Sequence, residues 1–329
     1  MIISQTPLRI SFSGGGTDFP GYYEKNEGYV VSAAIDKYVH VILTERYDEK
    51  IYLNYSRKET VDHVDEIRHE LVRESMRVAG VESGVEVTLL SDIPSEGSGL
   101  GSSSSFTVGL LNAFHVLQGE QAGPAQLAEE ACEVEIRRCG KPIGKQDQYI
   151  AAFGGMRGFR FRRDGGVEAE RLVSSSEKLH RLSSNLFLFY TASTRKASDI
   201  LAEQNDRVPE NLHALHRIKE LAREAGGAVR VDDFDRIGRV LGENWTLKKG
   251  LASQITNSRI DEVHALAMRA GATGAKLCGA GGGGFLLVYC PSPAHPALFE
   301  AMSGYRRMPF LIERDGSKVI FNYRRSSWK

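Results

Sequence analysis

The chain has 329 residues, of which 41% are hydrophobic and 26% are charged, a composition typical of a folded globular protein. This length is sufficient for two domains with adjoining cores. The 42 basic and 42 acidic residues balance, so the net charge gives no indication that the partner is a nucleic acid or an anionic membrane surface.

Cysteine spacing and hydropathy bear on the cellular compartment. The cysteines form no C-x-x-C pair and have no histidine at zinc spacing, which predicts reduced thiols in a cytoplasmic protein; they are Cys132, Cys139, Cys278 and Cys290. The N-terminal residues lack a basic segment followed by an apolar one, and no stretch approaches the ~20 apolar residues of a membrane span. We therefore expect neither a signal peptide nor a membrane contact, and the sequence leaves open whether the chain forms a homodimer.

In chain order, the first half alternates strands, helices and glycine-rich loops. Alternating or β-rich segments predict strands at 7–12, 29–43, 51–55, 85–90 and 156–161. Helical spacing or a first-turn proline predicts helices at 64–78, from a glycine- and serine-rich stretch to about residue 117, and at 124–138. A turn at 164–166 and the polar segment after it suggest a domain boundary, which divides the chain into domains 1–175 and 176–329.

The second half has a different order of elements. Its segments predict a buried strand at 185–191, helices at 197–225, 233–246 and 258–270, a glycine-rich hairpin at 274–289, a helix at 294–303 and a strand at 318–323. Strands and helices do not alternate regularly, so we predict an α+β fold rather than repeated βαβ units.

The stretch from Pro94 to Gly109, PSEGSGLGSSSSFTVG, precedes one of these predicted helices. Glycines allow backbone N–H groups to converge on one point, and the start of a helix adds the positive end of its dipole. This combination favours binding of an anion, most commonly a phosphate. The stretch is not a Walker A loop, because no Gly-Lys-Ser/Thr ends it, and its glycine spacing is not that of a dinucleotide-binding fingerprint.

Two further glycine clusters accompany this loop, PLRISFSGGGTD at 7–18 and KLCGAGGGGF at 276–285. In this order the three clusters resemble the signature motifs of the GHMP kinases, the superfamily of galactokinase and of homoserine, mevalonate and phosphomevalonate kinases. The resemblance implies a ribosomal-protein-S5-like N-terminal domain, a ferredoxin-like C-terminal domain, and ATP with Mg²⁺ as cofactors. It assigns the ATP phosphates to Pro94, Glu96, Gly97, Ser98, Gly99, Leu100, Gly101, Ser102, Ser103 and Ser104.

Several charged residues match the family's catalytic positions. Asp147, in the segment GKQDQY, resembles the catalytic aspartate; a helix N-cap is its structural alternative. Whether Asp147 acts as a base or as an electrostatic stabiliser is left open. Arg9 is expected near the reacting centre, and Lys145 near the transferred phosphoryl group. Glu135, twelve residues before Asp147 in the sequence, is expected to bind Mg²⁺ with Ser103, although neighbouring glutamates also fit a solvated acidic face.

The first cluster bears on the acceptor. Asp18 is expected to accept hydrogen bonds from sugar hydroxyls, and Gly15, Gly16 and Thr17 replace the Glu-His-Thr of galactokinases, which argues against galactose. The segments SGGGTDFP and GKQDQY together most resemble those of kinases that act on C1 of D-glycero-D-manno-heptose 7-phosphate. Such a substrate needs cations for its phosphate. We assign them to Arg195 and Lys196 and place Gly281 and Gly282 on the substrate side. Lys248 and Lys249 are further candidates for the phosphate, although we expect them to form a solvated helix face.

The expected function is therefore an ATP-dependent sugar 1-kinase that makes a heptose 1,7-bisphosphate for nucleotide-activated heptose synthesis. One alternative is an L-fucose or other hexose 1-kinase of the same superfamily. A second is a non-catalytic sensor that binds sugar and ATP, although the presence of Asp147 favours an enzyme. A decarboxylase of the mevalonate branch would share the fold, but the SGGGTD motif argues against this alternative.

Overall fold

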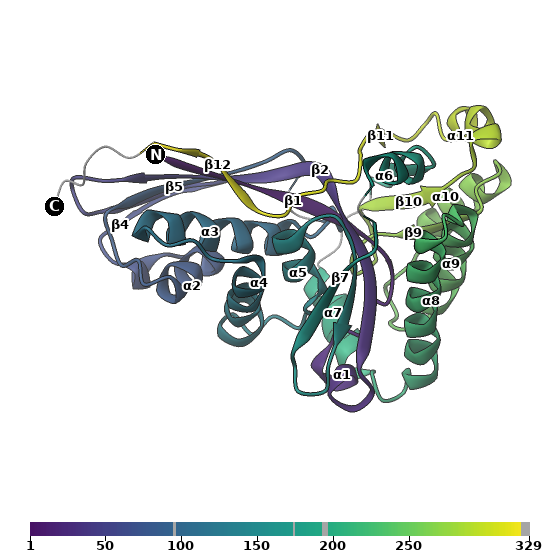
Figure 1. Ribbon diagram of the computed structural model, residues 1–329, viewed down its shortest axis with the longest axis horizontal. Helices are drawn as coiled ribbons and strands as arrows, with labels where there is room; N and C mark the ends of the chain where they lie inside the picture. The colour runs from purple at the N-terminus through teal and green to yellow at the C-terminus, as the bar shows by residue number, and fades with distance from the viewer. Residues whose placement is uncertain (95–96, 174, 193–196, 324–329) are drawn as a thin grey trace.

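The computed structural model describes residues 1–94, 97–173, 175–192 and 197–323. Two β-sheets stand at opposite sides of the molecule, with helices between and around them (Figure 1). The first sheet is built on two long antiparallel strands. Its strands are β1 (Ile2–Ser13), β2 (Gly28–Glu45), β3 (Ile51–Asn54), β4 (Lys58–Val61), β5 (Val85–Ser91), β6 (Met156–Phe161), β7 (Val167–Arg171) and β12 (Lys318–Asn322).

Strand β2 is long enough to pair with different partners along its length. Its first part, 28–33, pairs with β6, and its second part, 39–45, pairs with β5, while β1 runs antiparallel along its other edge. The register of β1 and β2 shifts between Pro7 and Leu8, just before Arg9. Such an irregularity bends a strand and changes the direction of the side chains that follow it.

Most helices of the first half lie on one face of this sheet. They are α1 (Pro20–Asn26), α2 (Glu70–Val78), α3 (Ser102–Gln118), α4 (Pro124–Cys132) and α5 (Gln146–Phe153), with a 3₁₀ turn η1 (Val64–Glu66) and a π-helix η2 (Glu133–Arg138). Helix α3 packs on β1 and β2, and its apolar residues there are fully buried. Burial of one large aliphatic side chain contributes about 1.5–3 kcal/mol to folding. This packing fixes the first turn of α3, where the glycine- and serine-rich loop ends.

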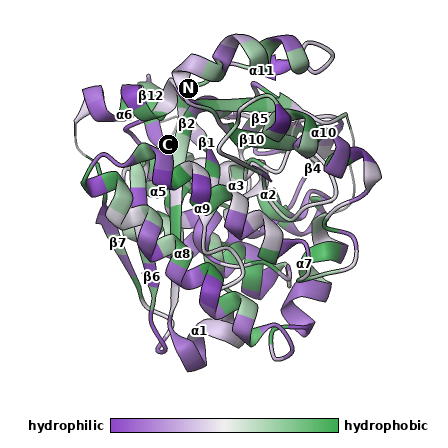
Figure 2. Cartoon of the chain, turned by 90° about the vertical axis from the view of Figure 1, so that its right-hand side faces the viewer, coloured by the Kyte–Doolittle hydropathy of each residue, from purple (hydrophilic) through white to green (hydrophobic). Residues whose placement is uncertain are grey.

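The second sheet is antiparallel, in the order β11-β8-β10-β9. Its strands are β8 (Leu186–Tyr190), β9 (Gly274–Leu277), β10 (Phe285–Tyr289) and β11 (Arg307–Met308). Around it lie α6 (Ser176–Ser183), α7 (Ala197–Asp206), α8 (Leu212–Arg230), α9 (Phe234–Lys248), α10 (Ser258–Arg269), η3 (Ser292–Ala294) and α11 (His295–Ala301). Green and purple stretches alternate along α8, as expected for a helix with one face on a core (Figure 2).

Helices α8 and α9 join the two sheets. Helix α8 packs on β1 and β2, and α9 packs on β1, β9 and β10. One buried cluster therefore contains Ile10 and Phe12 of the first sheet, Leu221 of α8 and Leu287 of the second sheet. This shared core holds the three glycine clusters in fixed positions relative to one another.

Three predicted elements differ from the observed ones. The helix predicted at 197–225 is divided into α7 and α8 around Pro209, whose ring fixes φ and removes a hydrogen-bond donor. The helix predicted at 124–138 continues after Cys132 as a π-helix, and the helix predicted at 64–78 begins only at Glu70. Strand β12 returns to pair with β1, so the range 176–329 contributes to both sheets (Figure 1). The boundary near residue 175 stays a prediction.

Candidate active site

The three glycine clusters meet at a cavity of about 430 Å³ between the two halves of the fold. Its walls come from β1, α3, α5, η2, α7, α9 and the loop between β9 and β10. Of the residues predicted from the sequence, it is lined by Arg9, Gly15, Gly16, Asp18, Gly97, Ser98, Gly99, Gly101, Ser102, Ser103, Ser104, Glu135, Asp147 and Gly281. Most of the predicted site is thus brought to one place, although these residues are far apart in the sequence.

The glycine- and serine-rich loop has the geometry of an anion site. Gly97, Gly99 and Gly101 have φ angles of 72°, 73° and 80°, and Gly101 is the N-cap of α3. The first N–H groups of a helix have no partner within the helix, and in α3 they belong to residues that line the cavity. Pro94 and Leu100 do not line it, and Glu96 lies outside the described residues.

The second and third clusters contact each other directly through glycine backbone. A Cβ on Gly279 would lie 2.6 Å from the Cα of Gly99, and a Cβ on Gly99 would lie 2.6 Å from the carbonyl oxygen of Cys278. Side chains larger than hydrogen are therefore excluded at this contact. The loop that belongs to the second half of the chain forms one wall beside the anion site.

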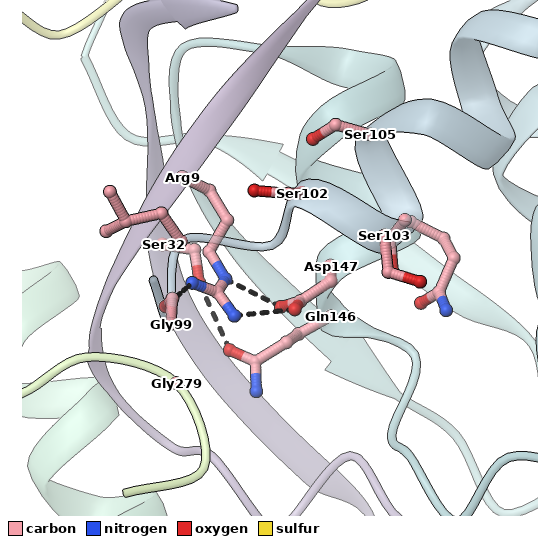
Figure 3. A network of polar contacts seen from close by, with 12 residues as sticks. Arg9, Ser32, Gly99, Ser102, Ser103, Ser105, Gln146, Asp147 and Gly279 are labelled. Atoms are coloured by element: carbon pink, nitrogen blue, oxygen red, sulfur yellow. Dashed lines mark hydrogen bonds and ion pairs between the residues drawn. The ribbon is translucent and has the colours of Figure 1, made fainter. Parts of the chain in front are cut away.

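Arg9, which is buried, and Asp147, whose side chain is 22% exposed, form an ion pair that lines the cavity (Figure 3). Arg9 donates from Nε to Asp147 Oδ1 at 2.7 Å and from Nη2 to Oδ2 at 2.5 Å, and its Nη1 donates to the carbonyl of Gly99 at 2.5 Å. Burial alone lowers the pKa of Arg9, but the Asp147 carboxylate raises it above its ordinary value. Asp147 lies in the first turn of α5 and Lys145 is the N-cap, so the N-cap alternative for Asp147 does not apply.

Asp18 is held close to the Arg9–Asp147 pair. Its carboxylate accepts hydrogen bonds from the N–H of Gly16 at 2.9 Å and of Gln146 at 3.1 Å. A Cβ on Gly144 would lie 2.0 Å from Asp18 Oδ2, so glycine is required there for the carboxylate to approach. Burial raises the pKa of Asp18 to about 6, with a smaller contribution from the negative charge of Asp147, against the lowering by its two N–H donors.

Glu135 lies on the π-helix, a rare form that often occurs at functional sites. Its carboxylate is fully buried and accepts hydrogen bonds from Ser103 Oγ at 2.8 Å, Ser104 Oγ at 2.6 Å and Gln148 Nε2 at 2.6 Å. Carboxylate and hydroxyl oxygens are ligands that Mg²⁺ accepts. The alternative that Glu135 belongs to a solvated acidic face does not hold, because Glu135 is fully buried.

The described part of the chain contains no group of three or more His, Cys, Asp or Glu residues that could hold a metal ion by itself. Mg²⁺ commonly binds to one or two protein oxygens and completes its shell with nucleotide phosphates and water. Ser103 and Glu135 fit that pattern, since both face the cavity beside the anion loop.

Two lysines line another wall of the cavity: Lys276 is buried and Lys248 is partly exposed, and Lys276 was not among the site residues predicted from the sequence. Lys248, at the end of α9, donates to the carbonyl of Gly279, and Lys276 of β9 donates to the carbonyl of Phe12 at 3.3 Å. Burial lowers the pKa of Lys248 to about 8, and burial with the charge of Lys248 lowers that of Lys276 well below its usual range. The expected solvated face is therefore wrong for Lys248. A lysine within the fully buried strand 274–277 was the available signal for Lys276.

Lys145, Thr17 and Gly282 are not among the residues that line the cavity. Lys145 does not line it, because its ammonium donates to the Gly165 carbonyl at 2.7 Å and lies over the ring of Tyr23. Thr17 is fully buried and its hydroxyl donates to the Gly14 carbonyl at 2.7 Å, which closes the turn of the first cluster. The backbone N–H of Gly282 donates a hydrogen bond to the carbonyl oxygen of Ile255. Arg195 and Lys196 lie outside the described residues.

Two family models match this chain. Residues 63–155 match the family model of the GHMP kinase N-terminal domain, and residues 225–303 match that of the GHMP kinase C-terminal domain. No helix in the described ranges has the length and apolar character needed to cross a membrane.

Three proteins that are similar to this chain are named as kinases of sugars or sugar phosphates. The chain is 32% identical to the D-glycero-alpha-D-manno-heptose 7-phosphate kinase of Campylobacter jejuni, over 96% of this chain and 98% of that protein. A crystal structure of a D-glycero-D-manno-heptose 1-phosphate kinase from Bacteroides thetaiotaomicron is 25% identical, with a TM-score of 0.82 over 98% of this chain and 100% of that one. The L-fucokinase/L-fucose-1-P guanylyltransferase of Bacteroides fragilis is 26% identical, over 89% of this chain and 35% of that protein.

The match to both family models and the identity across almost the whole chain confirm the predicted α+β fold and the predicted superfamily. The chain therefore belongs to the GHMP kinases, and its relatives identify it as a kinase that transfers a phosphoryl group to a hydroxyl group.

Proposed function

We propose that this kinase phosphorylates the C1 hydroxyl of D-glycero-D-manno-heptose 7-phosphate and forms the 1,7-bisphosphate, which can then be activated with a nucleotide. The similarity to the Campylobacter jejuni heptose 7-phosphate kinase along nearly the whole chain supports this substrate. The observation that carries the chemistry is the Arg9–Asp147 ion pair, which lies beside the anion loop in the cavity that Asp18 also lines.

The phosphate end of ATP fits the loop at 97–104. Backbone N–H groups at the start of α3 would hold the phosphate oxygens, and the helix dipole favours the negative charge there. Ser103 and Glu135 would hold Mg²⁺, which neutralises phosphate charge when it is bound. Phosphoryl transfer depends mainly on position and on charge stabilisation, so these groups together with Asp147 account for the donor side.

Asp18 and its neighbours form the acceptor side. An ionised, buried carboxylate with two N–H donors keeps lone pairs available to accept hydrogen bonds from sugar hydroxyls. Gly15 and Gly16 line the cavity beside it, and a longer sugar with a phosphate would extend into that cavity. The 7-phosphate would need cations, and Arg195 and Lys196 remain the prediction for that contact.

Asp147 would orient the C1 hydroxyl and favour loss of its proton as the bond to phosphorus forms. Both of its carboxylate oxygens accept hydrogen bonds from Arg9, which fixes the direction of the carboxylate. Lys248 and Lys276 would stabilise the negative charge of the transferred phosphoryl group. Their ammonium groups line the same cavity, and no ion pair joins either of them to an acidic residue in the described ranges.

An L-fucose 1-kinase is the alternative, supported by the similarity to the Bacteroides fragilis fucokinase. A coupled assay of ADP release with heptose 7-phosphate, unphosphorylated heptose, L-fucose, galactose and mevalonate distinguishes the two. We expect kcat/KM for heptose 7-phosphate to exceed that for the free sugar by at least about 100-fold, because the site must pair its phosphate. Equal rates with heptose and its phosphate would contradict the proposal, and a preference for L-fucose would favour the alternative.

A further inference from the structure

Lys141 lies beside the Ser103–Glu135 pair and has had no role so far. Its Nζ donates to Ser103 Oγ at 3.1 Å and lies 3.6 Å from Glu135 Oε1. The backbone fixes this position, since the N–H of Lys141 donates to the carbonyl of Glu135 at 3.0 Å. The ammonium thus contacts the same two side chains that fit a magnesium ion.

We propose that Lys141 is a countercation of Glu135, which it neutralises in the nucleotide-free enzyme and releases when a divalent ion arrives with ATP. The proposal rests on the proposed function only in taking Ser103 and Glu135 as the metal ligands. It adds a residue that controls when the metal binds.

The electrostatic reason is the burial of Glu135. Its carboxylate is fully buried, and its three other donors, Ser103, Ser104 and Gln148, are neutral. A buried carboxylate that has hydrogen bonds but no cation is unfavourable, and in the described ranges Lys141 is its only ion-pair partner. The ammonium therefore stabilises the empty site.

The same charge opposes a metal ion. A divalent cation bound to Ser103 and Glu135 would lie within a few ångströms of the ammonium, and like charges at that distance repel strongly in a partly buried site. The ion alone cannot displace Lys141 easily. An ion bound to ATP can, because the phosphates bring negative charge that offsets the repulsion.

A second carboxylate provides a place for the displaced ammonium. Glu70, at the start of α2, lies 3.7 Å from Lys141 Nζ, and its side chain is 53% exposed where Glu135 is 0% exposed. Lys141 is thus between a buried partner inside the cavity and an exposed partner at its rim. A small rotation of its flexible side chain would exchange one for the other.

Binding of Mn²⁺ to the nucleotide-free protein, measured from the EPR signal of free Mn²⁺, tests the proposal. We expect Lys141→Met to bind Mn²⁺ on the order of tenfold more tightly than the wild type, because one positive charge is removed from the site. Lys141→Arg should bind as weakly as the wild type. Mg²⁺ alone should raise the melting temperature of Lys141→Met and leave that of the wild type unchanged.

Two variants locate the effect. When Glu135→Gln is combined with Lys141→Met, the increase in Mn²⁺ affinity should disappear. Lys178→Met removes an exposed ion pair with Asp232 at 3.0 Å and should leave the Mn²⁺ affinity unchanged. If Lys141→Met is unstable, Lys141→Gln replaces it. Equal Mn²⁺ affinity in wild type and Lys141→Met would overturn the proposal, as would a gain that survives Glu135→Gln. No sugar or nucleotide is present, so failure of the proposed heptose activity would leave this result unaffected.

Discussion

The two walls of the cavity differ in how their charges are balanced. On the wall formed by β1, α3, α5 and the π-helix, Arg9 is paired with Asp147 and Lys141 with Glu135. On the wall formed by α9 and the loop after β9, Lys248 and Lys276 contact backbone carbonyls, and no acidic side chain in the described ranges pairs with either.

This difference assigns the two walls different tasks. Paired charges have fixed directions, so the first wall can orient an acceptor and a metal ion. Buried ammonium groups without a carboxylate are unfavourable, and the pKa of Lys248 falls to about 8 mainly through burial. A ligand phosphate restores the missing negative charge. Binding of an anion should therefore stabilise the charges of the second wall more than those of the first.

The largest expected effect is on the first wall. Asp147→Asn should lower kcat by a factor of about 10³ or more, because the amide cannot favour loss of the hydroxyl proton and cannot balance Arg9. Affinity for ATP should change little, since the hydrogen bonds of Asp147 go to Arg9, and it is Arg9 that contacts Gly99 of the anion loop. Steady-state kinetics and calorimetric titration with ATP measure the two quantities. The exposed Asp164→Asn serves as control, and a near-normal kcat for Asp147→Asn would remove this residue from the mechanism.

The second wall should show a smaller effect. Lys248→Met should lower kcat/KM by about 100-fold, because a charge–phosphate interaction in a closed active site is worth a few kcal/mol. Lys249→Met is the matched control. Its side chain is 38% exposed and pairs with Asp261 at 3.6 Å, so we expect a change of less than about twofold. Similar rates for both variants would show that the unpaired lysines have no part in the reaction.

The smallest effect concerns pH. Asp18 accepts hydrogen bonds from the acceptor only when ionised, so kcat/KM for the sugar should fall about tenfold per unit as the pH drops below about 6. A bell-shaped profile whose acidic limb lies near the ordinary pKa of an aspartate would contradict this. The affinity for ATP, measured over the same pH range, should not fall below about pH 6.

Stability gives an independent measure of the same group. The folded pKa of Asp18 is raised to about 6 from 3.8, so its protonated form stabilises the fold at low pH, and this contribution is lost as the pH rises through about 6. The difference corresponds to on the order of 3 kcal/mol. Denaturant titrations between pH 4 and pH 7 measure the free energy of unfolding of the wild type and of Asp18→Asn. The two values should converge at the acidic end, and toward neutral pH the wild type should lose stability relative to Asp18→Asn.

Local sequence predicted much of the first wall. The loop at 97–104, Asp18, Glu135 and Asp147 each stand in a short segment with its own pattern, and the structure brings them to one cavity. The roles assigned to them stay predictions. Lys145 stands beside Asp147 in the sequence but contacts Gly165 instead, because successive residues of a helix point in different directions.

The second wall was not predictable in the same way. Lys248 has Lys249 and Gly250 as neighbours, and nothing in that segment distinguishes a buried lysine from a solvated one. Its burial follows from the packing of α9 against β9 and β1, which are more than 25 residues distant in either direction. Lys141 was missed for a similar reason, since its contact with Ser103 joins residues 38 positions apart.

The sequence by itself predicted the α+β fold from its order of elements and the superfamily from the resemblance of its three glycine clusters. It predicted an anion loop from glycine positions and a helix start, which are set by local backbone geometry. Only the tertiary structure decided which charges are paired and which are left for a ligand. Pairing depends on burial and on contacts between distant segments, such as Arg9 with Asp147 and Gly99 with Gly279.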